Sequence, residues 1–143
     1  HMTRVDFYVL SAKAVDARLT TVCRVSEKAW RQGFKVMICT GDAKQAESMD
    51  RMLWTFRDDS FVPHERWSEG DQDASQAPIL ITCGSAPPQV ADVWVNLGRT
   101  PLAIEGRNRI AEIVGTDAEA KQMARDRYRH YRQLNCELHT HEL

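Results

Sequence analysis

Short apolar runs alternate with amphipathic segments along the chain, and this pattern predicts strands alternating with helices. Residues 4–10, RVDFYVL, are rich in β-branched and aromatic side chains and predict an opening strand. Apolar residues then recur at spacings of three and four, which predicts a helix that is capped at its C-terminal end by Gly33. The buried stripe of that helix is expected to contain Leu19, Val22, Cys23, Ser26, Ala29 and Trp30.

The alternation continues through the middle of the chain. Residues 34–40, FKVMICT, predict a buried strand, and Asp42 stands at the N-cap of a second predicted helix. Residues 61–78 are polar and irregular, so they predict a surface loop. The second helix takes its apolar face from Ala46, Met49, Leu53 and Phe56.

Residues 78–83 and 92–98 are two more strand-like runs, separated by the turn-forming GSAPPQ. Residues 108–115, NRIAEIVG, fit either a strand or a short helix, and the glycines on both sides favour a strand. A last helix is expected from about Asp117 to Gln133. This order predicts an α/β fold with a Rossmann-like, mainly parallel sheet and helices on both faces.

The composition is that of an ordinary soluble domain, with 43% hydrophobic residues and a net charge of −1 over 143 residues. We expect a single domain over residues 1–143, in which residues 1–2 are the remnant of a tag. The cysteines form no Cys-x-x-Cys pair, which disfavours a zinc or redox motif and fits a reducing cytoplasm. Cys39 and Cys83 end apolar runs and are expected to be buried thiols.

Signatures of catalysis are missing from the sequence. No Gly-x-Gly-x-x-Gly or Gly-Lys-Ser/Thr motif follows the predicted strands, and the single glycine in CTGDAKQAES is interpreted as a turn residue. His139 and His141 form a His-x-His pair, but a frayed tail would supply no third metal ligand. We therefore expect no metal, no cofactor and no active site. An enzyme acting on a nucleotide is suggested by the fold type alone.

The last predicted helix carries one basic and aromatic stripe. Its core contacts are expected to be Ala120, Met123, Ala124 and Tyr131, with Arg127 at their margin. Such a stripe is often only the solvated face of a helix. The scarcity of acidic neighbours favours instead an acidic peptide or a nucleic-acid backbone, and Val114 is placed to contribute to an apolar hollow beside it. The stripe consists of Lys121, Arg125, Tyr128, Arg129 and Arg132, at helical spacing.

A second cluster of large apolar residues lies in LWTFRDDSFVPHERW, where a helix end meets the following loop. Exposed aromatic residues there would mark a partner surface. The alternative is that Trp54 and Phe61 cover the edge of the sheet. The pattern leaves both interpretations open.

Four segments, FYVL, KAWRQGFKVMI, DAKQAESMDRMLWTFRDDSFVPH and AEAKQMARDRYRHYRQLNCEL, resemble in order and spacing the chi subunit of bacterial DNA polymerase III. The most specific parts are the LW…SFVPH block and the ARDRYRxYR helix. Residues 98–109 are the least similar part, and nothing is transferred to them. The resemblance implies a Rossmann-like accessory protein of the clamp-loader assembly that has lost nucleotide binding.

The resemblance also implies partners. Chi proteins link the polymerase holoenzyme to single-stranded-DNA-binding protein by binding its acidic C-terminal tail, which ends in a hydrophobic residue. The psi subunit, or a helicase that competes with it, binds a second surface, which matches Trp54 and Phe61 here. The positions that match the tail site are Val114, Lys121, Arg125, Tyr128 and Arg129.

Direct binding of single-stranded nucleic acid by the basic helix is the alternative function. Cationic and aromatic side chains suit single strands. Nucleic-acid-binding domains usually carry a net positive charge, and this chain carries −1. An adaptor without its own active site is therefore the favoured interpretation.

Overall fold

The computed structural model describes residues 2–11, 13, 16–57, 62–67, 76–84 and 91–143. The chain begins with β1 (Arg4–Val9), α1 (Ala17–Arg31), β2 (Val36–Thr40) and α2 (Ala43–Thr55). Four strands follow, β3 (His64–Arg66), β4 (Ile79–Cys83), β5 (Val93–Asn96) and β6 (Arg109–Val114). The last two elements are α3 (Ala118–Gln133) and β7 (Glu137–Glu142).

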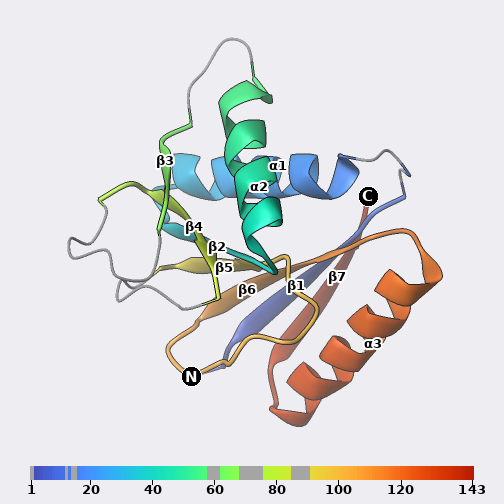
Figure 1. Ribbon diagram of the computed structural model, residues 1–143. Coiled ribbons are helices and arrows are strands. Elements are labelled where there is room, and N and C mark those ends of the chain that lie inside the picture. The colour runs from blue at the N-terminus through green and yellow to red at the C-terminus, as the bar shows by residue number, and fades with distance from the viewer. Residues whose placement is uncertain (1, 12, 14–15, 58–61, 68–75, 85–90) are drawn as a thin grey trace.

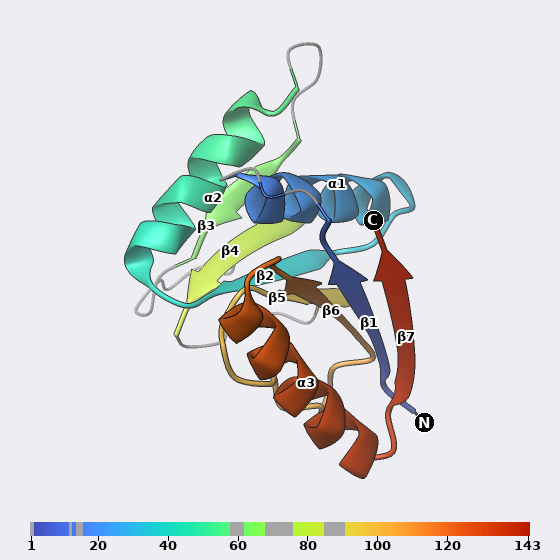
Figure 2. The ribbon, with the colours of Figure 1, turned by 90° about the vertical axis from the view of Figure 1, so that its right-hand side faces the viewer.

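The seven strands form one parallel sheet in the order β3-β4-β2-β5-β6-β1-β7. Helices α1 and α2 cover one face of the sheet, and α3 covers the other (Figures 1 and 2). Because the strands are parallel, the loops that follow β4, β2, β5 and β6 meet at the same edge. The predicted α/β class, with helices on both faces, is confirmed.

The core under α1 and α2 follows the predicted stripes. Val22 and Cys23 of α1 pack in the same cluster as Met49 and Leu53 of α2 and the inward side chains of the central strands. The caps are confirmed as well. The N–H of Gln45 donates to Asp42 Oδ1 at 2.8 Å. Gly33, at a φ of 89°, donates its N–H to the Trp30 oxygen at 2.9 Å.

The core under α3 is centred on Tyr131, whose side chain is fully buried among Val5, Phe7, Trp94 and Val114. The loop between β5 and β6 runs beside it, and Leu102 of this loop packs against the cluster. The Leu102 N–H donates to the Tyr131 hydroxyl at 2.9 Å. The predicted helix and the preceding strand, β6, are both confirmed.

Two strands lie where the sequence pattern predicts none. Residues 64–66 form β3 within the expected loop 61–78, and the expected frayed tail contains β7, which pairs in parallel with β1. Both are edge strands with largely polar side chains, HER and ELHTHE, so neither shows the apolar run of a buried strand. The described part of the chain contains no group of three or more His, Cys, Asp or Glu residues suited to a metal.

The cysteines differ from expectation at one position. Cys83 is exposed at the end of β4, so the prediction that it is buried is wrong. Cys39 is half-buried, and burial raises the pKa of its thiol, like that of Cys23, to about 12. Both thiols are therefore poor nucleophiles. No helix in the described ranges is long and apolar enough to span a membrane.

Candidate functional site

Helix α3 presents the predicted cations to solvent. Its N-cap is Asp117, whose Oδ1 accepts the Ala120 N–H at 2.7 Å, and its buried side is formed by Ala124, Arg127 and Tyr131. Lys121, Arg125 and Arg129 are exposed, and their spacing places them along one face.

Tyr128 lies between this exposed face and the core. Its ring is half-buried and packs against Phe7 of β1, with the ring centroids 5.4 Å apart. Val114 ends β6 in the same apolar cluster, but only 4% of its surface is exposed. The structure therefore brings four of the five predicted positions to one helix face, and it places Val114 beneath that face.

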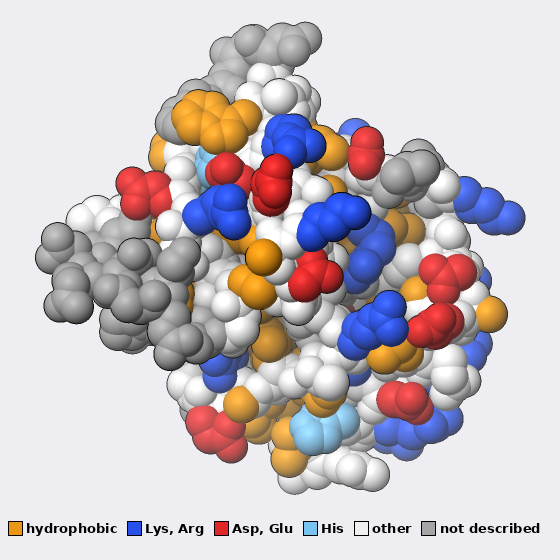
Figure 3. Space-filling view, viewed as in Figure 1, with side chains coloured by type: hydrophobic (Ala, Val, Ile, Leu, Met, Phe, Trp, Pro, Cys, Tyr) orange, Lys and Arg blue, Asp and Glu red, His pale blue; other side chains and the backbone are white. Residues whose placement is uncertain are grey.

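Acidic and amide side chains accompany the basic stripe. Asp126 Oδ1 accepts from Arg129 at 3.3 Å and from Gln122 at 3.3 Å, while Arg125 donates to Gln122 at 3.4 Å. Among the described residues, no carboxylate forms an ion pair with Lys121 or Arg125. Figure 3 shows acidic and basic side chains interspersed on the α3 side of the molecule. The charge that remains available for a ligand lies mainly on Lys121 and Arg125.

The opposite side of α3 is anchored by a buried ion pair. Arg127 Nε donates to Glu112 Oε1 at 2.9 Å, and the Tyr131 hydroxyl and Asn96 Nδ2 donate to Glu112 Oε2 at 2.6 and 2.9 Å. Burial raises the pKa of Glu112, and the Arg127 charge opposes that rise. Arg127, expected at the margin, is only 5% exposed. One feature of the sequence could have predicted this network. A single acid, Glu112, lies inside the apolar strand RIAEIV, and a buried acid needs a partner.

Of the two residues predicted to form the partner surface, Trp54 lies in the described part of the chain. Trp54 lies in the last turn of α2 and is 58% exposed, with its ring edge-to-face to His64 of β3 at 5.1 Å. Phe61 lies outside the described residues. Trp54 therefore touches the edge strand but leaves more than half of its surface to solvent. Figure 3 shows hydrophobic side chains on the surface at this end of the molecule.

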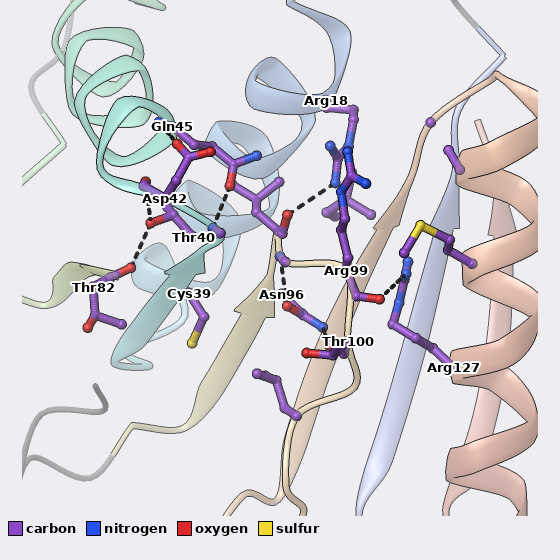
Figure 4. A pocket seen from close by; sticks show the side chains of 18 of the residues that line it. Arg18, Cys39, Thr40, Asp42, Gln45, Thr82, Asn96, Arg99, Thr100 and Arg127 are labelled. Carbon is purple, nitrogen blue, oxygen red and sulfur yellow. Dashed lines mark hydrogen bonds between the residues drawn. The ribbon is translucent and has the colours of Figure 1, made fainter. Parts of the chain in front are cut away.

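A cavity of about 680 Å³, called the edge cavity below, lies at the carboxyl ends of β4, β2, β5 and β6. Figure 4 shows Thr40, Thr82 and Asn96 at the strand ends around it, with Arg18 of α1 and Arg99 of the β5–β6 loop on its other side. A second cavity of about 460 Å³ lies between α1 and strands β1, β5 and β6, beside Phe34 and Arg109. Lys121, Arg125, Tyr128 and Arg129 line neither of these two cavities.

Residues 2–139 match the sequence model of the family described as DNA polymerase III chi subunit, HolC. The chain therefore belongs to the chi subunit family of DNA polymerase III. DNA polymerase III subunit chi of Pseudomonas aeruginosa is 39% identical over 143 residues, which cover 99% of this chain and 98% of that protein. The subunit of Escherichia coli K12 is 32% identical over 150 residues, which cover 97% of both chains.

A third chi subunit and one solved structure are also similar to this chain. The chi subunit of Haemophilus influenzae is 30% identical over 137 residues, which cover 94% of each chain. Among solved structures, the C-terminal domain of the DEAD-box protein Dbp5 superposes with a TM-score of 0.61 at 12% identity, over 99% of this chain and 90% of that one. At this identity the likeness concerns the fold alone.

Proposed function

We propose that this chi-family chain is a non-catalytic adaptor of the bacterial replisome, working in the cytoplasm. In this role it links the clamp loader of DNA polymerase III to single-stranded-DNA-binding protein by holding that protein's acidic C-terminal tail. The observation that carries the proposal is the exposed face of α3, where Lys121 and Arg125 stand beside the half-buried ring of Tyr128.

The chemistry of this face suits a peptide that is acidic and ends in an apolar residue. Lys121 and Arg125 hold charge that no carboxylate neutralises among the described residues, and an arginine offers two parallel hydrogen bonds to a carboxylate. Arg129 would exchange its contact with Asp126 for one with the tail. Tyr128 would hold the terminal side chain, and Val114 supports the core beneath it.

The expected affinity is modest and sensitive to salt. Exposed ion pairs contribute about 0–1 kcal/mol each, and salt screens them. Because the tail site lies on the helix surface and not in either described cavity, the terminal side chain is expected to be only partly buried. The acids Glu119 and Asp126 on the same helix repel an acidic peptide and a phosphate backbone alike, which also keeps the expected affinity modest.

Arg125→Ala is expected to weaken binding of an aspartate-rich peptide ending in phenylalanine by about fivefold, because one exposed ion pair is lost. Isothermal titration calorimetry at low salt measures this change. Arg31→Ala is the matched control, since Arg31 is an exposed arginine on α1 with a long ion pair to Glu27 at 3.7 Å. Equal affinities for wild type and Arg125→Ala would refute the assignment.

We further propose that Trp54, together with Phe61, forms the surface for the psi subunit or for a helicase that replaces it. The exposed indole at the end of α2 supports this assignment, because large exposed aromatic rings are common at the centres of interfaces. Trp54→Ala is expected to lose a psi subunit or helicase in pull-down experiments while it retains the tail peptide. Retention of these partners by the variant would contradict the assignment.

A further inference from the structure

Glycines surround the edge cavity. Gly41 follows β2, Gly84 follows β4, Gly98 follows β5 and Gly115 follows β6, and these four strands are neighbours in the sheet. A Cβ on Gly98 would come within 3.2 Å of Asn96 Oδ1, and one on Gly115 within 3.4 Å of Ala120. These added Cβ atoms would meet atoms of the protein itself, whereas a Cβ on Gly84 would have no atom within 4 Å. The N–H groups of Gly41 and Gly98 already donate to Gln45 Oε1 at 2.7 Å and to Asn96 Oδ1 at 2.9 Å.

Four arginines line this cavity and most of its acids are already engaged. Arg127 is paired with Glu112, and Arg99 is paired with Glu119 at 3.3 Å. The other lining carboxylates, Asp42 and Asp117, cap α2 and α3. Arg107 lies over the Trp94 ring at 4.3 Å and donates to the Ala103 oxygen.

Arg18, like Arg107, is a lining arginine that no carboxylate pairs with among the described residues. Within the described ranges it forms no ion pair, its Nε has no hydrogen-bond partner, and its only hydrogen bond is a long one of 3.5 Å to the Leu97 oxygen. Burial and then the nearby charge of Arg127 lower its pKa. Figure 4 shows Arg18 and Arg99 on the same side of the cavity, and the charge of Arg99 also lowers the Arg18 pKa. An anion placed there would neutralise a charge that the protein itself leaves unpaired.

We propose that the edge cavity binds the phosphate group of a small molecule, held by Arg18 between the glycine-rimmed strand ends and the first turn of α3. A guanidinium matches phosphate oxygens in geometry and charge. The first turns of α2 and α3 border the cavity, and the N-terminal ends of helices favour anions, although Asp42 and Asp117 already cap these two ends. The volume of about 680 Å³ is in the usual range for a small-molecule site.

This site differs from the phosphate loops that the sequence lacks. Such loops place several glycines in one strand-to-helix turn. Here each strand supplies one glycine, and the order of the strands in the sheet brings them together. The site is also separate from the exposed face of α3, since none of Lys121, Arg125 and Tyr128 lines the cavity.

The test is a nuclear magnetic resonance titration of the isotopically labelled chain with sodium phosphate and with adenosine monophosphate, against sodium chloride at matched ionic strength. We expect the amide signals of Gly41, Gly98 and Gly115 to shift with both phosphates and not with chloride. Arg18→Gln is expected to weaken binding about tenfold, while Arg31→Gln on the same helix leaves it unchanged. Circular dichroism verifies that both variants are folded.

Four results would overturn the proposal. The first is the absence of glycine shifts at millimolar phosphate, and the second is an affinity that Arg18→Gln does not change. The third is a set of shifts confined to Lys121, Arg125 and their neighbours, which would indicate nonspecific attraction to the basic stripe. Glycine shifts with an acidic peptide but not with either phosphate would assign the cavity to a peptide and would equally contradict a phosphate site.

Discussion

Arg127→Ala is expected to lower the free energy of unfolding by about 3–5 kcal/mol, the cost of removing one partner of a buried ion pair. The change leaves Glu112, which is fully buried, with hydrogen bonds from Tyr131 and Asn96 but no opposite charge. Glu112 then takes up a proton more readily, so its pKa in the folded variant rises further above the unfolded value. The variant is therefore less stable at about pH 8 than at about pH 5.

Urea unfolding followed by circular dichroism at both pH values measures this effect. Arg132→Ala is the matched control, because Arg132 is an exposed arginine on the same helix, and its loss is expected to change stability by at most about 0.5 kcal/mol. A loss below about 1 kcal/mol for Arg127→Ala would mean that the buried pair does not anchor α3.

Tyr128→Ala is expected to weaken binding of the acidic tail peptide about tenfold or more, which is the larger of the two expected effects on the peptide. Removing the ring takes away the contact proposed for the terminal side chain, and aromatic anchors contribute about 2 kcal/mol or more at interfaces. The ring also packs against Phe7, so Tyr128→Phe is the necessary control. It keeps the ring and the packing, and we expect it to bind the peptide nearly as well as wild type.

The sequence predicted the elements with buried faces. The helical stripe around Val22 and Cys23, the N-caps Asp42 and Asp117 and the apolar runs of the central strands all depend on local patterns, and the structure contains them. The edge strands β3 and β7 were missed because one side of each pairs with a neighbour while most of its side chains remain polar. Strand pairing at an edge leaves little trace in the pattern of hydrophobicity.

The surface of α3 was predictable because helical spacing alone aligns Lys121, Arg125 and Arg129. The edge cavity was not, because its parts come from strands far apart in sequence. Gly41 was interpreted as an ordinary turn residue. Only the strand order β4-β2-β5-β6 places it beside Gly98. A Cβ added to Gly41 would lie 3.8 Å from the Gly98 Cα. The sequence pattern also does not indicate that Arg18 lines this cavity, because its position there depends on how α1 packs beside the strand ends.

The central claim is that Tyr128 and the terminal apolar residue of an acidic tail meet on α3. A double-mutant cycle tests it directly, with calorimetry of wild type and Tyr128→Ala against the peptide ending in phenylalanine and the same peptide ending in alanine. The account predicts a coupling energy of about 1 kcal/mol or more between the two changes. Losses that add to within about 0.3 kcal/mol would mean that the two side chains do not touch, and would contradict the proposed mode of tail binding.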